Sequence, residues 1–162
     1  QDEGIYWARG NGWISAAGYD YLRARAVRGE TDEAVRESLA RHTAAVVASQ
    51  DPQTGLWWTV LNRPGETYLE TSAAALFALG LARGWRAGLL GDDVLPVIRK
   101  AMEGVQSRIV PGTDGKPVVT GVSGPTTAGT FQTYATVKLE DDLTYGIGAV
   151  ILALIETSGL PE

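Results

Sequence analysis

The pattern of apolar and polar residues predicts two amphipathic helices, over residues 33–49 and 93–107. In both segments apolar side chains recur every three or four positions, while polar side chains fill the remaining circumference. A helix with this pattern covers a core with one face and meets water with the other. We therefore expect both helices to lie on the outside of the molecule.

Three other segments predict helices that lie further inside. Residues 72–82 and 146–155 are apolar around nearly the whole helical circumference, so neighbouring elements must surround them. Residues 13–28 begin with small apolar residues and become basic on one side, which predicts partial burial. Buried and covering helices thus alternate along the chain, as in an all-α toroid built of helical hairpins. We expect residues 1–162 to belong to a single domain.

Two long connections interrupt this alternation, over residues 50–69 and 109–144. Each contains short β-type stretches bordered by Gly, Pro, Asn or Asp, which predict hairpins. Loops of this length in a compact domain usually serve a function. Because both connections run from an outer helix to the next inner one, we expect them to gather at one rim, together with the functional site.

Composition and charge exclude several classes of protein. The formal charge is −5, with 19 acidic and 14 basic residues, and the basic ones are scattered, so we expect no nucleic-acid partner. The chain has no cysteine, which excludes disulfides and thiolate metal sites. No apolar run approaches the ~18 residues that span a membrane, and no His, Asp or Glu grouping has metal-ligand spacing. We expect no membrane association, no metal, no cofactor and, by default, a cytoplasmic location.

The motif Trp-Ala-Arg-Gly-Asn-Gly-Trp at residues 7–13 concentrates groups that suit a sugar acid just ahead of an inner helix. The guanidinium of Arg9 offers a planar set of donors to a carboxylate. The indoles of Trp7 and Trp13 present flat apolar faces to sugar rings, and the amide of Asn11 can both donate to and accept from hydroxyls. The structural alternative places both indoles in the core and Arg9 in a surface ion pair. The clustering of these groups favours binding.

This heptapeptide resembles a signature of glycoside hydrolase families 88 and 105. Further stretches resemble the same families in the same order along the chain: residues 50–57, 68–73, 121–127 and 141–149. The resemblance covers essentially the whole chain. It implies an (α/α)6 toroid of about twice this length, of which this chain is the carboxy-terminal half.

The resemblance also implies an activity on oligosaccharides left by polysaccharide lyases. In these families an aspartate hydrates the C4=C5 double bond of an unsaturated uronic acid at the non-reducing end, and the resulting hemiketal rearranges to release the sugar. That aspartate lies on the amino-terminal side of the Trp-Ala-Arg motif. We therefore expect no catalytic residue in this chain, a binding role for Trp7, Arg9, Asn11 and Trp13, and further sequence upstream of residue 1, which is not Met.

Other candidate binding residues each have a structural alternative. Glu70 and Ser72 lie at the predicted start of an inner helix and could reach substrate, but Thr71 or Ser72 could equally cap that helix. Trp57 and Trp58 alternate on a predicted strand, so one of them should face inward. Trp58 is the candidate for sugar contact.

The remaining polar candidates favour structural roles. Asp141 and Asp142 precede an inner helix, where capping is a better explanation than an acid/base pair, because neighbours in sequence seldom converge on one atom. His42 falls on a covering helix and is expected to be structural. Residues 121–125 lack the Lys and helix start of a phosphate loop and are expected to form the lip of the pocket.

Two functions of different classes remain open. The first is the substrate-binding half of an unsaturated glucuronyl or rhamnogalacturonyl hydrolase, a glycosidase that is inactive without its amino-terminal half. The second is a non-catalytic carbohydrate-binding or interaction module. The expected partners are an oligosaccharide with an unsaturated uronic acid end and, for the open flanks of a half toroid, either the amino-terminal half or a second copy of the chain.

Overall fold

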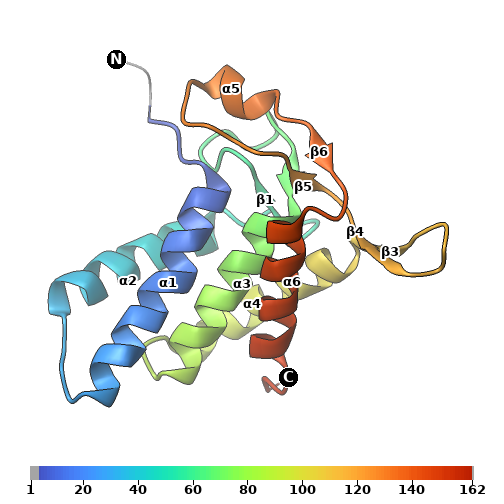
Figure 1. Ribbon diagram of the computed structural model, residues 1–162. Coiled ribbons are helices and arrows are strands. Elements are labelled where there is room, and N and C mark those ends of the chain that lie inside the picture. Colours follow the sequence, from blue (N-terminus) through green and yellow to red (C-terminus); the bar gives the residue numbers. More distant parts are fainter. Residues whose placement is uncertain (1–3, 162) are drawn as a thin grey trace.

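The computed structural model describes residues 4–161, which form about half of an α/α toroid (Figure 1). Its inner helices stand side by side: α1 (Ala8–Val27), α3 (Thr71–Arg86) and α6 (Thr144–Thr157). Behind them lie the outer helices α2 (Glu33–Ala48) and α4 (Leu95–Gln106), the latter after a 3-10 turn, η1 (Asp92–Val94). The predicted all-α class and the alternation of inner and outer helices are confirmed.

Helix α3 forms the centre of this arrangement. Its sequence is rich in Ala and Leu, which favour helix. It is followed by Gly88 with φ +68°, a left-handed conformation that glycine adopts without strain. Every residue from 71 to 82 is buried, because α1, α4 and α6 pack around the helix. The core therefore sits between the inner and outer layers, with α3 inside it.

Helix α1 begins at Ala8, so residues 7–13 lie in its first turns and not ahead of it as predicted. Two glycines lie within these first turns, although glycine weakens helices. Packing explains the earlier start. A Cβ on Gly12 would lie 2.8 Å from the Cβ of Leu76, and a Cβ on Gly80 would lie 2.3 Å from the Oγ of Ser15. Glycines thus let α1 and α3 approach closely.

The two long connections gather at the amino-terminal ends of the inner helices, as predicted (Figure 1). Two antiparallel strand pairs lie there: β1 (Trp57–Trp58) with β2 (Leu69–Glu70), and β5 (Val122–Ser123) with β6 (Leu139–Glu140). The short helix α5 (Phe131–Ala135), which the apolar pattern did not predict, lies between β5 and β6 in sequence. A third pair, β3 (Ile109–Pro111) with β4 (Pro117–Val119), projects away from the helices.

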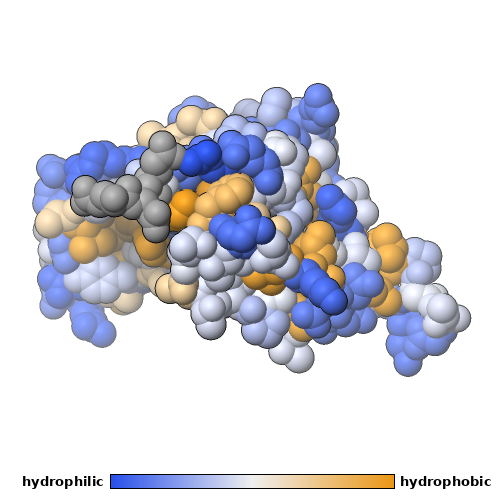
Figure 2. Space-filling model, turned by 90° about the horizontal axis from the view of Figure 1, so that it is seen from above, coloured by the Kyte–Doolittle hydropathy of each residue, from blue (hydrophilic) through white to orange (hydrophobic). Residues whose placement is uncertain are grey.

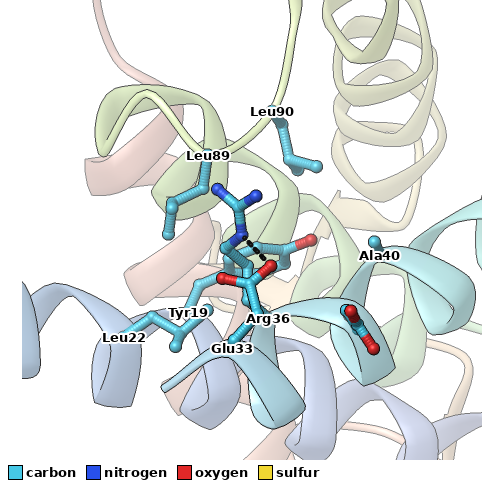
Figure 3. A pocket seen from close by; sticks show the side chains of 8 residues that line it. Tyr19, Leu22, Glu33, Arg36, Ala40, Leu89 and Leu90 are labelled. Carbon is cyan, nitrogen blue, oxygen red and sulfur yellow. Dashed lines mark hydrogen bonds and ion pairs between the residues drawn. The ribbon is translucent and has the colours of Figure 1, made fainter. Parts of the chain in front are cut away.

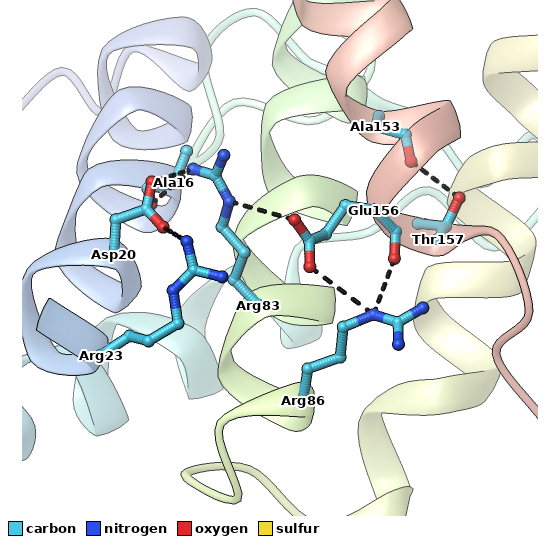
Figure 4. A network of polar contacts seen from close by, with 8 residues as sticks. All are labelled: Ala16, Asp20, Arg23, Arg83, Arg86, Ala153, Glu156 and Thr157. Carbon is cyan, nitrogen blue, oxygen red and sulfur yellow. Dashed lines mark hydrogen bonds and ion pairs between the residues drawn. The ribbon is translucent and has the colours of Figure 1, made fainter. Parts of the chain in front are cut away.

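At the opposite end of the inner helices, Arg83 of α3 joins its two neighbours (Figure 4). Its guanidinium lies 2.5 Å from a carboxylate oxygen of Asp20 on α1 and 3.5 Å from one of Glu156 on α6. Arg23 and Arg86 also contact these two carboxylates. The network therefore fixes all three inner helices to one another at this end.

The two inner helices that flank α3, namely α1 and α6, expose apolar side chains. On α1 these are Trp13, Ile14 and Tyr21, and on α6 they are Ile151, Leu152 and Ile155, each between 42% and 66% exposed. None of the helices in residues 4–161 is long and apolar enough to cross a membrane.

Candidate functional site

The first residues of α1 are fixed to the rim by the 57–61 segment. Trp7 has extended backbone and forms an isolated antiparallel bridge with Val60, and the N–H of Ala8 donates to the carbonyl of Thr59 at 2.9 Å. These bonds satisfy donors that the start of a helix leaves free. They also place the predicted binding motif beside the strand pairs of the rim.

Arg9 lies in the first turn of α1 and is 5% exposed. Its guanidinium donates to the carbonyls of Ser123 at 2.6 Å and Gly124 at 3.0 Å, and to the hydroxyl of Thr126 at 3.1 Å. It therefore holds the segment that the sequence predicted as the lip of a pocket. The structural alternative of a surface ion pair for Arg9 is wrong, because the partners are backbone carbonyls and a hydroxyl.

Aromatic rings enclose this guanidinium. The ring centroids of Trp7 and Tyr145 lie 5.1 and 4.7 Å from the Arg9 Cζ. Tyr134 of α5 lies against Trp7, with ring centroids 5.8 Å apart. Burial raises the pKa of Tyr145, while the positive charge of Arg9 opposes that shift. The Tyr145 hydroxyl stays protonated near neutral pH and donates to the carbonyl of Ser123 at 2.6 Å.

The two other motif residues take separate positions. Trp13 is four residues after Arg9, so both lie on one side of α1, and its indole is 50% exposed. Asn11 is two residues after Arg9 and points elsewhere. Its amide donates to the carbonyl of Trp7 at 2.8 Å, and it lines a different cleft, of about 440 Å³, with Tyr6 and His42. The structure thus brings Trp7 and Arg9 together, places Trp13 on the same side of α1 as Arg9, and directs the Asn11 side chain to the Trp7 carbonyl.

Glu70 and Ser72 are fully buried. Glu70 caps α3, because its carboxylate accepts the backbone N–H groups of Ser72 at 3.2 Å and Ala73 at 2.6 Å, so the prediction of Thr71 or Ser72 as the cap is wrong. The hydroxyl of Ser72 donates to the same carboxylate at 2.8 Å. Among residues 4–161, the connection from these two residues to Arg9 passes through Ser123, whose N–H donates to Glu70 at 2.9 Å.

The predicted alternation of the two adjacent indoles is confirmed. Trp57 is fully buried, packs on Phe77 and donates from Nε1 to the carbonyl of Val46 at 2.8 Å. Trp58 is half-buried on the other face of β1. The expected capping of α6 by Asp141 or Asp142 is wrong. Asp142 has φ 53°, and its carboxylate accepts the N–H of Val119, which ties β4 to the start of α6.

His42 lies on α2 as predicted, and both of its ring nitrogens are buried with no hydrogen-bond partner among the described residues. Burial lowers its pKa. A further cleft of about 230 Å³ lies towards the other end of α1, where Tyr19, Leu22 and Leu89 line it beside the ion pair of Arg36 with Glu33 (Figure 3). Within residues 4–161, no three His, Asp or Glu side chains come together as metal ligands would.

When the molecule is viewed from above, apolar residues form separate patches among hydrophilic ones (Figure 2). The sequence placed Ser123 only within the predicted lip, and it did not identify several other residues that build the site: Tyr68, Thr126, Tyr134 and Tyr145. Their common signal is position, since all lie in or next to the two long connections that were expected to be functional. The contacts of Ser123 with Arg9 and with Tyr68 join residues that are more than fifty positions apart in the chain.

Comparison with known proteins shows which sequences share these features. The family described as Glycosyl Hydrolase Family 88 matches residues 1–160. The chain is 32% identical over 167 residues to the 24.9 kDa protein in the picA locus of Rhizobium radiobacter, covering 93% of this chain and 71% of that protein. It is 38% identical over 78 residues to an unsaturated rhamnogalacturonyl hydrolase of Bacillus subtilis, covering 48% of this chain and 22% of that enzyme.

A solved structure shares the fold. The crystal structure of a possible member of the GH105 family from Klebsiella pneumoniae superposes with a TM-score of 0.80 at 32% sequence identity. The match covers 93% of this chain and 38% of the Klebsiella chain. The chain thus spans less than half the length of that structure, while its helices follow the same path.

Proposed function

The chain belongs to glycosyl hydrolase family 88, and from that membership we propose that it carries the substrate-binding half of an unsaturated uronyl hydrolase. The substrate is an oligosaccharide with an unsaturated uronic acid at its non-reducing end. The Bacillus subtilis relative, named for its action on unsaturated rhamnogalacturonyl substrates, supports this substrate class. So does the resemblance of residues 7–13 to the family signature.

One observation carries the proposal: a buried positive charge lies on the same side of α1 as a half-exposed indole. The fixed guanidinium of Arg9 attracts the carboxylate of a uronic acid, because a charge withdrawn from water acts through a lower effective dielectric. Its three hydrogen bonds to residues 123–126 do not exhaust the five donors of a guanidinium. The exposed ring of Trp13 offers an apolar surface to the sugar ring.

Binding and chemistry are divided in this proposal. The 162-residue chain holds the sugar acid, with Trp7 supporting Arg9 and with Trp58 as a further contact from the rim. The general acid that hydrates the C4=C5 double bond is an aspartate on the amino-terminal side of Trp7. The chain alone therefore binds the unsaturated sugar without consuming it, and it turns the sugar over only together with that aspartate.

Binding by the chain is measured by calorimetry with an unsaturated uronyl disaccharide. We expect Trp13→Ala to weaken binding by roughly tenfold, because the apolar face of the sugar loses its partner. Tyr21→Ala is the matched control, since Tyr21 is an exposed aromatic residue near the other end of the same helix. Equal affinities of the wild-type chain and Trp13→Ala would contradict the assignment.

The absorbance of the conjugated double bond reports turnover in the same mixtures. We expect it to stay constant with the isolated chain. Loss of the absorbance would show that a catalytic group lies within residues 1–162. Absence of binding to any uronic acid would contradict the proposed function as a whole.

A further inference from the structure

The backbone of Ser123 lies between two buried charges. Its N–H donates to the carboxylate of Glu70 at 2.9 Å, and its carbonyl accepts from the guanidinium of Arg9 at 2.6 Å. The hydroxyl of Tyr145 donates to the same carbonyl, also at 2.6 Å. Ser123 and Glu70 are fully buried, and Arg9 is 5% exposed. A single residue thus connects the start of α3, the start of α1 and the start of α6.

The arrangement offsets the cost of burying two opposite charges. A charged group in a poorly polarisable interior is costly unless a partner compensates it. Among the described residues, the charged side chain connected to Glu70 is Arg9, and the connection passes through Ser123. The carboxylate accepts from the N–H of that residue and the guanidinium donates to its carbonyl, so each is a charge-assisted hydrogen bond to the same residue.

We propose that Glu70 is a positioning residue for Arg9, acting through the backbone of Ser123. The proposal rests on the proposed function, in which Arg9 attracts the uronic acid carboxylate. Glu70 fixes residues 123–126, these residues fix the guanidinium, and the fixed guanidinium distinguishes a charged sugar acid from its uncharged analogue. Glu70 itself does not touch the sugar, because it has no exposed surface.

A simpler role for Glu70 is the capping of α3 alone. Capping needs the bonds from Ser72 and Ala73 but does not need the bond from Ser123. Two substitutions separate these roles. Glu70→Gln removes the charge, and its amide N–H group cannot accept from the surrounding donors. Glu70→Asp keeps a carboxylate, and aspartate is a good capping residue. Its side chain is shorter by one methylene, which moves the carboxylate away from Ser123.

The first measurement compares calorimetric affinities for an unsaturated uronyl disaccharide and its methyl ester. The wild-type chain is expected to prefer the acid. We expect both Glu70→Gln and Glu70→Asp to reduce this preference by roughly tenfold, the scale of one charge-assisted hydrogen bond, while affinity for the ester changes little. Glu103→Gln is the control, because Glu103 is exposed on α4. An equal loss of affinity for the acid and the ester, or an unchanged preference for the acid in Glu70→Asp, would show that Glu70 only caps α3. Either result would overturn the proposal.

The second measurement needs no ligand and so separates this proposal from the proposed function. Hydrogen exchange of the Arg9 guanidinium protons is followed by nitrogen-15 NMR in the full chain. We expect exchange at least tenfold faster in Glu70→Asp than in the wild type and in Glu103→Gln, although Arg9 is unchanged and does not contact Glu70. Unchanged exchange would overturn the proposal. If the wild-type chain binds neither ligand but Glu70→Asp still exchanges faster than the wild type, only the proposed function is contradicted.

Discussion

Burial of charge distinguishes Arg9 and Glu70 from the other charged residues of the described chain. The sequence indicated that Arg9 matters, because it lies between two indoles, but it did not indicate what the guanidinium would bind. Its partners are carbonyls that lie 114 and 115 residues away. When a charged side chain bonds to backbone groups, its partner is not an oppositely charged residue. The sequence therefore does not show where the pairing occurs.

His42 makes stability depend on pH in a defined direction. Its pKa is lowered by burial, so the folded chain binds a proton less readily than the unfolded chain, whose histidine titrates near 6.5. The stability that the neutral ring contributes is therefore present above about pH 6.5 and is lost as the pH falls through the lowered folded value. We expect the urea midpoint of the wild type to decrease between pH 7.5 and pH 5.

The comparison with His42→Leu isolates this effect. The variant keeps an apolar side chain at a half-buried position but has no titrating ring, so its midpoint should depend less on pH over the same interval. The carboxylates Asp32 and Asp114, whose pKa values are lowered by their hydrogen bonds, titrate below this range in both proteins. Equal slopes for the two proteins would show that His42 does not contribute.

At the scale of elements, two helical glycines should respond oppositely to the same substitution. A Cβ on Gly80 would lie 2.3 Å from Ser15 Oγ and 2.7 Å from its carbonyl carbon, whereas a Cβ on Gly148 would have nothing within 4 Å. We expect Gly80→Ala to lower the free energy of unfolding by about 1–3 kcal/mol through overpacking. Gly148→Ala should raise it by up to about 1 kcal/mol through helix propensity alone.

Urea denaturation of the two variants provides the measurement. Because the chemical change is identical, each variant is the control for the other. Stabilisation in both would mean that α1 and α3 separate easily and that the close approach of the helices is not required for folding.

Periodicity was sufficient to predict the helices but not their ends. The apolar pattern located all five long helices, since it reflects which face meets the core. It placed the start of α1 several residues too late, because the contacts that compensate for Gly12 come from Leu76 on another helix. It missed α5, whose five residues are too few to show a period. Trp58 could be oriented from strand alternation, whereas the contacts of Glu70 required the position of Ser123.

At the scale of the whole molecule, Arg83 connects the three inner helices at the end opposite the rim, through its ion pairs with Asp20 and Glu156. We expect Arg83→Met to lower the free energy of unfolding by about 1–2 kcal/mol, because Asp20 and Glu156 then keep only their contacts with Arg23 and Arg86. The loss should shrink at high salt, since the network is partly exposed.

Arg36→Met is the matched control for the network. Arg36 makes an exposed ion pair with Glu33 within one helix, so its removal should change stability by less than about 0.5 kcal/mol. Equal effects of the two substitutions in urea denaturation would show that Arg83 contributes no more to stability than an exposed ion pair within one helix.

The central position of α3 also has a consequence for synthesis. A ribosome releases residues 71–86 well before it has made residues 144–157, yet α6 covers one flank of that apolar helix. Until α6 emerges, the nascent chain presents an uncovered apolar surface of the kind that aggregates or recruits chaperones. A translational pause just before Thr144 would therefore hold the protein in an aggregation-prone form, and the rate at which residues 144–157 are made becomes part of how this domain reaches its folded state.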